Sequence, residues 1–157
     1  FFTVYGPWGR PDMSLFKFTK NIFNGEKIDV YNYGKHSRDF TYIDDVTNAI
    51  AKLINLIPQT NPEWNSGLKT LNESSAPWKI YNIGNNNPVK LTSFIKIIEK
   101  ECKKKANINF LPLQNGDVPK TYADIQDLFE TIEFKPEVTI EEGISNFVSW
   151  FKKYYKI

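Results

Sequence analysis

Apolar residues recur along the chain with two different spacings, which predict an alternation of strands and helices. Short runs of β-branched and aromatic residues, bounded by turn-forming residues, indicate strands. Apolar residues that return every three or four positions indicate amphipathic helices. The predicted strands cover residues 1–5, 28–31, 40–43, 78–83 and 108–113, and the predicted helices cover residues 15–23, 46–57, 91–98, 124–132 and 139–154. This alternation predicts an α/β lobe with an aromatic-rich interior.

Several residues mark the expected ends of the helices. Asn24 and Gly25 offer the left-handed backbone with which helices often end. Thr139, with Glu142 three positions later, has the spacing of a capping box at the start of the last helix. Asp44, directly after a predicted strand, is expected to cap the helix that follows it.

The connections between the elements differ in length. Strands 28–31 and 40–43 flank a Tyr-Gly-Lys turn, so they are expected to form either a hairpin or two neighbouring sheet edges. Residues 59–78 are rich in Asn, Ser, Pro and Glu with scattered apolar positions, which predicts a long surface loop.

Composition and charge exclude several classes of protein. A length of 157 residues suits one compact domain or one lobe of a larger enzyme. The formal charge of +2 comes from interspersed signs, without the basic stripe that nucleic acid or anionic lipid would require. No apolar run approaches the ~20 residues of a membrane span. We therefore expect a soluble protein with no nucleic-acid or membrane partner.

The single cysteine and the single histidine limit the chemistry further. Cys102 has no partner for an internal disulfide, which suits a reducing cytoplasm, and it is expected to be inert. Because His36 and Cys102 are far apart in the sequence, no zinc-type ligand cluster and no metal site are expected. His36 lies in a turn-like stretch and is expected to be a solvated loop residue rather than a general base. The four tryptophans are expected to be packing anchors, with Trp8 alone inside a candidate site.

Two arginines are the candidates for anion recognition. Arg10 follows a rigid Gly-Pro-Trp-Gly loop, so its guanidinium can present two parallel donors to a carboxylate, with the Thr3 hydroxyl beside it. A surface ion pair with Asp12 is an equally weighted alternative. Arg38 precedes a strand, from which it can reach a diphosphate at the sheet edge. Its alternative is an ion pair with a neighbouring aspartate, either Asp39 or Asp44.

Asp117 is the candidate for binding a ribose. Its carboxylate, in the turn after Gly116, can accept hydrogen bonds from both ribose hydroxyls. Aspartate is also common in turns because it bonds to its own backbone, and this structural interpretation carries more weight from the residues alone.

Five ordered motifs together are similar to the carboxy-terminal half of UDP-glucuronate 4-epimerases, which are NAD-dependent epimerase/dehydratase enzymes of the extended short-chain dehydrogenase/reductase type. The motifs are FFTVYGPWGRPDM at residues 1–13, VYNYG at 30–34, RDFTYIDD at 38–45, YNIG at 81–84 and GDV at 116–118. The resemblance implies the carboxy-terminal substrate-binding lobe of such an enzyme, with mixed small sheets and packed helices.

The resemblance also implies a mechanism and roles for residues. Bound NAD takes hydride from the sugar C4, the 4-keto sugar rotates, and hydride returns to its other face. Thr3 and Arg10 would hold the hexuronate carboxylate, Arg38 the diphosphate, and Asp117 with Gln114 the ribose region. The related galactose epimerases carry asparagine at the position of Thr3 and arginine at that of Gln114. Both departures favour a uronate substrate.

The resemblance further implies how the chain is organised. Residues 1–157 would be the nucleotide-sugar-binding lobe, while the NAD-binding Rossmann domain, with its glycine-rich loop and Tyr-x-x-x-Lys base, would lie upstream of Phe1. We therefore expect no catalytic and no cofactor-binding residue in this chain, and no turnover by this fragment alone. The full-length protein is expected to be a cytoplasmic homodimer in capsular polysaccharide biosynthesis, with a UDP-sugar as its partner.

Two alternatives stay open at this point. One is a decarboxylating relative that makes a UDP-pentose from UDP-glucuronate. The other is a non-catalytic module that binds nucleotide sugars.

Overall fold

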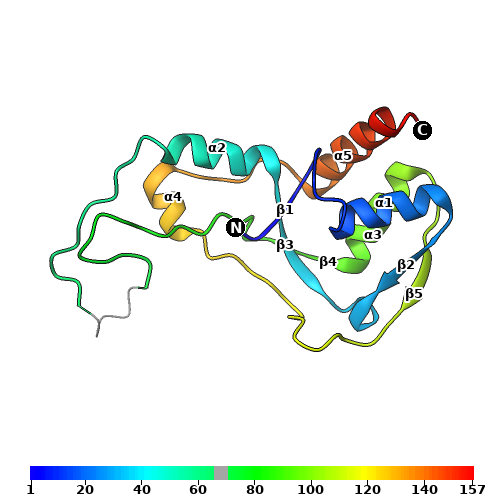
Figure 1. Cartoon of the computed structure of the whole chain (residues 1–157), viewed down its shortest axis with the longest axis horizontal. Coiled ribbons are helices and arrows are strands. Elements are labelled where there is room, and N and C mark those ends of the chain that lie inside the picture. The colour runs from blue at the N-terminus through cyan, green and yellow to red at the C-terminus, as the bar shows by residue number, and fades with distance from the viewer. Residues whose placement is uncertain (66–70) are drawn as a thin grey trace.

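Two small sheets and five α-helices make up the computed structural model of the chain, which describes residues 1–65 and 71–157 (Figure 1). In the first sheet, β1 (Thr3–Tyr5) pairs in parallel with β3 (Ser37–Tyr42), and β3 pairs antiparallel with β4 (Pro88–Lys90). In the second sheet, β2 (Lys27–Val30) pairs in parallel with β5 (Asn107–Phe110). The predicted α/β lobe with mixed small sheets is confirmed.

A hairpin between β2 and β3 is not formed, because the turn between them directs the chain elsewhere. Asn32, Tyr33 and Gly34 in the short helix η1 (Tyr31–Gly34) all have positive φ angles. The backbone N–H of Tyr33 donates to the carbonyl of Leu111, and the N–H of Leu111 donates to the carbonyl of Val30. The turn is therefore bonded to the chain beyond β5, and β3 continues into the other sheet.

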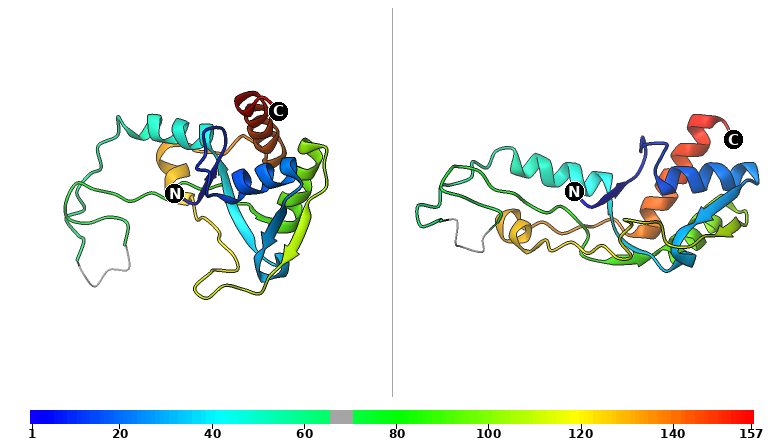
Figure 2. Two further views of the ribbon diagram at one scale, coloured as in Figure 1. Left: turned by 45° about the vertical axis from the view of Figure 1, so that its right-hand side comes forward. Right: turned by 60° about the horizontal axis from the view of Figure 1, so that its bottom comes forward.

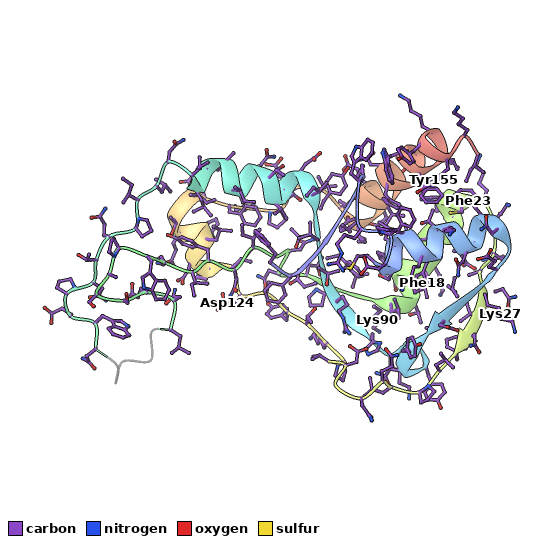
Figure 3. The ribbon with its side chains drawn as sticks, viewed as in Figure 1. Phe18, Phe23, Lys27, Lys90, Asp124 and Tyr155 are labelled. Atoms are coloured by element: carbon purple, nitrogen blue, oxygen red, sulfur yellow. The ribbon has the colours of Figure 1, made fainter. Side chains whose placement is uncertain are left out.

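Three helices pack together around the larger hydrophobic core. They are α1 (Ser14–Asn24), α3 (Leu91–Cys102) and α5 (Ile140–Tyr155), which gather at one end of the molecule (Figure 2). Phe40 of β3 stacks on the fully buried Phe94 of α3, with ring centroids 4.3 Å apart. Figure 3 shows the side chains of Phe18 and Phe23 on α1 and of Tyr155 on α5 at this helix-rich end. The aromatic-rich interior predicted from the sequence is located here.

A second, smaller core lies between α2 (Ile43–Leu53) and α4 (Gln126–Ile132). Its buried members are Val46, Ala49, Ile83, Leu128 and Phe134. Residues 78–83, predicted as a strand, form none. Lys79 makes an isolated bridge with Glu73, and the Ile83 carbonyl accepts the N–H of Phe2. This segment contributes Ile83 to the core without joining a sheet.

The helix ends agree with the sequence in part. Gly25 ends α1 with a φ of 71°, and the Thr139 side chain accepts the N–H of Glu142 at 3.2 Å, as predicted. The predicted cap at Asp44 is wrong, since α2 begins after Tyr42 with no side-chain cap. The helix also ends at Leu53 rather than near residue 57, and Ile54, which has no core to pack against, is 78% exposed.

Three further expectations concern the loop, the last helix and the cysteine. The described residues of the predicted loop 59–78 contain no helix or strand, and residues 66–70 lie outside the described part. The helix predicted at residues 139–154 is α5, and Tyr154 near its end is half exposed. Burial raises the pKa of the Cys102 thiol to about 11, which leaves little reactive thiolate at neutral pH. Among the described residues, no helix combines the length and apolar character needed to cross a bilayer.

Candidate functional site

Three polar side chains from two distant segments meet at the start of β3. Nη2 of Arg38 lies 2.8 Å from Oδ1 of Asp117, and Nε2 of His36 lies 3.2 Å from Oδ2 of the same carboxylate. Arg38 and Asp117 are partly exposed, at 22% and 32%, whereas His36 is only 5% exposed. Arg38 therefore donates to one oxygen of the Asp117 carboxylate, and His36 lies close to the other without a well-aligned hydrogen bond.

Backbone hydrogen bonds fasten the segment that carries Asp117 to β3. The N–H of Ser37 donates to the carbonyl of Pro119 at 2.9 Å, and the N–H of Thr121 donates to the carbonyl of Ser37 at 3.1 Å. These bonds flank the Arg38 position, so Asp117 has little freedom to move away from it.

A buried carboxylate, that of Asp39, strengthens the same junction. Its two oxygens accept the N–H of Asn85 at 2.7 Å and that of Ala123 at 2.8 Å, and its own N–H donates to the Thr121 hydroxyl. Asp39 has no exposed surface, and two backbone donors satisfy the carboxylate there. This role of Asp39 was not predicted, although a charged residue next to a run of apolar strand residues is the signal that indicates it.

Two expectations about this region are wrong. Arg38 pairs with neither Asp39 nor Asp44, because Asp39 is occupied by backbone N–H groups and Asp117 supplies the ion pair. His36 is not a solvated loop residue. It lies two positions before Arg38 on the chain entering β3, and residues at this spacing point to one face of a strand.

Arg10 lies in the loop that follows β1 and pairs with Asp12. Its Nε donates to Oδ1 of Asp12 at 3.0 Å, its Nη2 donates to Oδ2, and the arginine side chain is 75% exposed. The hydrogen bond from Arg10 lowers the pKa of the Asp12 carboxyl, and the same contact raises the pKa of Arg10. This is the alternative that the sequence analysis weighted equally with carboxylate recognition.

The loop nevertheless folds Arg10 back toward the strand. Arg10 and Thr3 line the same small cavity. The N–H of Gly9 donates to the carbonyl of Gly6 at 3.2 Å, and Gly6 has a φ of 145°. A ligand carboxylate entering this cavity would compete with Asp12 for the guanidinium.

Trp8 attaches this loop to the last helix. Its ring lies 5.3 Å from the rings of both Trp150 and Tyr154 of α5, although Trp8 itself is 74% exposed. The expected role of Trp8 as a packing anchor is consistent with these contacts. Trp8 also has a φ of 63°, which places its ring on α5 while the chain reverses toward Arg10.

Gln114 contributes its backbone to the turn before Asp117. Its carbonyl accepts the N–H of Asp117 at 3.2 Å, and Gly116 between them has a φ of 81°. The Gln114 residue is exposed. The structure thus places it near Asp117, while the ligand role of its side chain stays a prediction.

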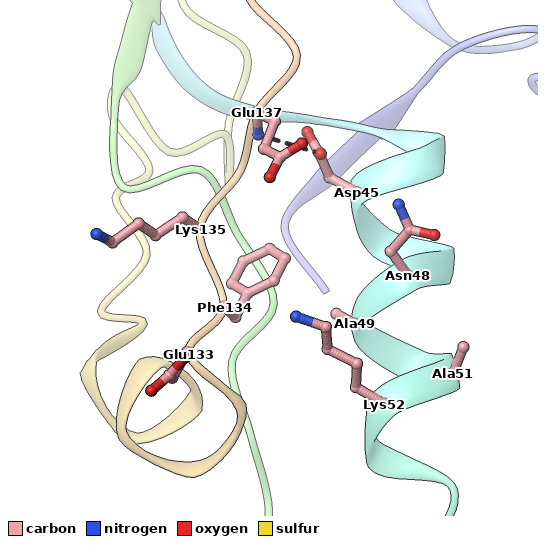
Figure 4. Close-up of a pocket in the computed structure, with 9 residues that line it drawn as sticks. All are labelled: Asp45, Asn48, Ala49, Ala51, Lys52, Glu133, Phe134, Lys135 and Glu137. Carbon is pink, nitrogen blue, oxygen red and sulfur yellow. Dashed lines mark hydrogen bonds between the residues drawn. The ribbon is translucent and has the colours of Figure 1, made fainter.

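A larger pocket, of about 520 Å³, lies between α2 and the segment after α4 (Figure 4). Asp45 at its edge accepts the N–H of Glu137 at 3.1 Å and that of Val138 at 3.3 Å. The remaining lining combines Lys52 and Lys135 with carboxylates. None of the predicted ligand-binding residues lines this pocket.

The family model and the solved structures similar to this chain come from one class of enzymes. Residues 1–67 match the NAD dependent epimerase/dehydratase family model. The fold agrees with the carboxy-terminal part of the extended short-chain dehydrogenase/reductase structures. One similar structure is that of UDP-glucuronic acid 4-epimerase from Bacillus cereus in complex with UDP-glucuronic acid and NAD. The match has a TM-score of 0.81 and 27% sequence identity, and it covers 98% of this chain and 44% of the Bacillus cereus chain. The resemblance to this class is confirmed.

Two curated relatives show which members of this class the chain resembles in sequence. Protein CapI of Staphylococcus aureus is 54% identical over 99% of this chain and 47% of its own length. A probable UDP-glucuronate 4-epimerase of Rhizobium meliloti is 47% identical over 99% of this chain and 46% of its own length. The chain is therefore similar to UDP-glucuronate 4-epimerases and spans about half the length of the curated relatives it matches.

Proposed function

We propose that the protein carrying this chain is an NAD-dependent nucleotide-sugar 4-epimerase that interconverts UDP-glucuronate and UDP-galacturonate. Residues 1–157 would form its nucleotide-sugar-binding lobe, completed by an amino-terminal NAD-binding domain. The observation that carries the proposal is the contact between Arg38 and Asp117. It brings the residue predicted to bind the diphosphate next to the residue predicted to bind the ribose, and these two groups are neighbours in a nucleotide. Similarity to UDP-glucuronate 4-epimerases supports it independently.

Arg38 and Asp117 would hold the nucleotide end of the substrate. A guanidinium has five N–H donors, and two are used here, one on Asp117 and one on the carbonyl of Ser37. The remaining donors are available to a diphosphate. The carboxylate can likewise accept further hydrogen bonds, since its two oxygens offer about four lone-pair sites. Asp117 would accept from the ribose hydroxyls, with Gln114 beside it.

Arg10 and Thr3 would hold the carboxylate of the hexuronate. The side chain of Arg10 already binds the carboxylate of Asp12 through two nitrogens, which is the geometry a uronate carboxylate requires. Thr3 lines the same cavity and would add a hydroxyl donor. Secure binding of the carboxylate opposes its loss as carbon dioxide from a 4-keto intermediate, which favours epimerisation over decarboxylation.

The residues described in this chain do not fit NAD. Its Gly84-Asn85-Asn86 turn lacks the further glycines of a dinucleotide fingerprint, and the N–H of Asn85 is already donated to Asp39. Tyr42, Tyr81 and Tyr122 have no lysine four positions later. Bound NAD would supply the hydride acceptor, and we assign its binding to the amino-terminal domain. Cytoplasmic location, a homodimer and a role in capsular polysaccharide biosynthesis stay predictions.

Product analysis tests the proposed reaction. The full protein, incubated with UDP-glucuronate and NAD, is expected to give UDP-galacturonate, an isomer of equal mass that chromatography separates. Residues 1–157 alone are expected to give no product. A UDP-pentose, lighter by one carbon dioxide, would support a decarboxylase instead. Binding of UDP-glucuronate by the full protein with no product would support a non-catalytic binding module.

A further inference from the structure

His36 is a buried, titratable side chain for which the proposed function gives no role. It is 5% exposed, and it is the only histidine of the chain. Its Nε2 has no well-aligned hydrogen-bond partner among the described residues, and the nearest acceptor, at 3.2 Å, is Oδ2 of Asp117. A buried ring nitrogen that faces a carboxylate proposed to bind the ligand indicates that His36 helps to place that carboxylate.

We propose that His36 is a positioning residue of the diphosphate site, holding the Asp117 carboxylate in place beside Arg38 and changing the charge of the site when it gains a proton. The proposal rests on the proposed function, since it takes Arg38 and Asp117 to contact the nucleotide. His36 itself would not touch the substrate.

The contacts of the Asp117 carboxylate support this role. Oδ1 of Asp117 accepts a hydrogen bond from Arg38, and Oδ2 lies 3.2 Å from Nε2 of His36, so the two side chains flank the carboxylate on opposite oxygens. Arg38 and His36 lie two positions apart on one chain segment, and the bonds of Ser37 between them hold the opposing segment. Without the imidazole, Asp117 would be free to rotate and to take more donors of Arg38 for itself. Fewer donors would then remain for a diphosphate.

The net charge of His36, Arg38 and Asp117 depends on whether the imidazole carries a proton. With neutral His36, Arg38 and Asp117 sum to no net charge, whereas with protonated His36 the cluster carries one positive charge. Histidine changes charge within about pH 5 to 8. The attraction of the site for a diphosphate should therefore rise as pH falls through this range. Of the other charged side chains on the flanking segments, Lys35, Lys90 and Lys120 are exposed, and the buried carboxylate of Asp39 is satisfied by the backbone N–H groups of Asn85 and Ala123.

The ligand chosen for the test must not titrate in the same range. A phosphate monoester has a second pKa of about 6 and would confuse the result. Both phosphates of a UDP-sugar are esterified on two sides, so UDP-glucuronate keeps its charge between pH 6 and 8. Any change in its affinity over this interval then comes from the protein.

Calorimetric titration of the full protein with UDP-glucuronate at pH 6 and pH 8 tests the proposal. We expect affinity to be about two- to fivefold higher at pH 6, the size of a partly solvated charge interaction. His36→Leu should weaken binding at both pH values and remove the difference between them. His36→Gln keeps an amide donor without the charge, so it should recover the affinity at pH 8 and still show no pH difference. Lys35→Gln, which removes an exposed charge from the same loop, should match the unaltered protein.

The outcomes separate the two proposals. If both His36 variants keep the affinity and the pH difference of the unaltered protein while Arg38→Ala weakens binding, the role of His36 is wrong and the diphosphate site stands. If Arg38→Ala also leaves binding unchanged, the proposed site itself is wrong. Should His36→Leu fail to fold, His36→Gln decides the matter alone, since a retained pH difference in that variant contradicts the proposal.

Discussion

Arg38 and Asp117 form an ion pair 2.8 Å long although 79 positions separate them in the sequence. Arg38 is the second residue of β3, while Asp117 lies in a turn outside the helices and strands. The bonds of Ser37 and of Asp39 to the following segment bring the turn to the strand. A binding site for the nucleotide end of a substrate therefore depends on a loop fixed by its own backbone.

The strength of this ion pair can be measured with a double-mutant cycle. We expect Arg38→Ala and Asp117→Ala each to lower the free energy of unfolding, and the double variant to lower it by less than the sum. The coupling should be about 0.5–1 kcal/mol, because both side chains are partly solvated. Urea denaturation of the four proteins gives the value. Strict additivity would show that the two side chains do not interact in solution.

Asp39 should matter more to stability than to binding chemistry. Asp39→Asn replaces one of two acceptor oxygens by a donor that faces a backbone N–H, so we expect a loss of about 1–3 kcal/mol in the free energy of unfolding. Asp44→Asn is the matched control, since Asp44 is exposed on α2 and its replacement should change stability by no more than about 0.5 kcal/mol. Equal effects of the two substitutions in denaturant titrations would contradict the role of Asp39.

Alkaline pH should destabilise the fold through Tyr5. Burial raises the pKa of the Tyr5 hydroxyl above its ordinary value of 10.0, with Tyr42, Asp45 and two glutamates adding to the shift. Because the folded state then keeps a proton that the unfolded state releases, Tyr5 does not affect stability below about pH 10 and lowers it above that pH. Tyr5→Phe should flatten this fall, measured as unfolding free energy at pH 8 to 10.5. The same slope in both proteins would show that Tyr5 is not responsible.

Local patterns predicted the elements that pack against a core. Phe40, Phe94 and Gly25 behave as their spacing and type indicated, because periodicity and the left-handed preference of glycine act over a few residues. Pairing of strands was not predicted, since β2 finds its partner in β5 about eighty positions later. The segment 78–83 has strand-like residues but gains stability from burying Ile83 beside α2.

In the candidate site, too, the local features were predicted from the sequence and the long-range contacts were not. The residue types and motifs selected Arg38 and Asp117, but neither revealed that the two side chains bind each other or that Asp39 ties their segments together. Burial of His36 is equally a tertiary effect, since Asp117, which contacts its ring, lies about eighty positions away in the sequence. The partner of Arg10 was among the alternatives because Asp12 is local, two positions away.

The most direct test of the central claim compares how two arginine variants of the full protein bind two ligands that differ in one carboxylate. Titration with UDP-glucuronate and with UDP-glucose should show that Arg38→Ala weakens both, because both carry the diphosphate. Arg10→Ala should weaken UDP-glucuronate about tenfold or more and leave UDP-glucose unchanged, while Lys17→Ala, an exposed charge nearby on α1, should alter neither. Equal affinity of Arg10→Ala and the unaltered protein for UDP-glucuronate would contradict the account.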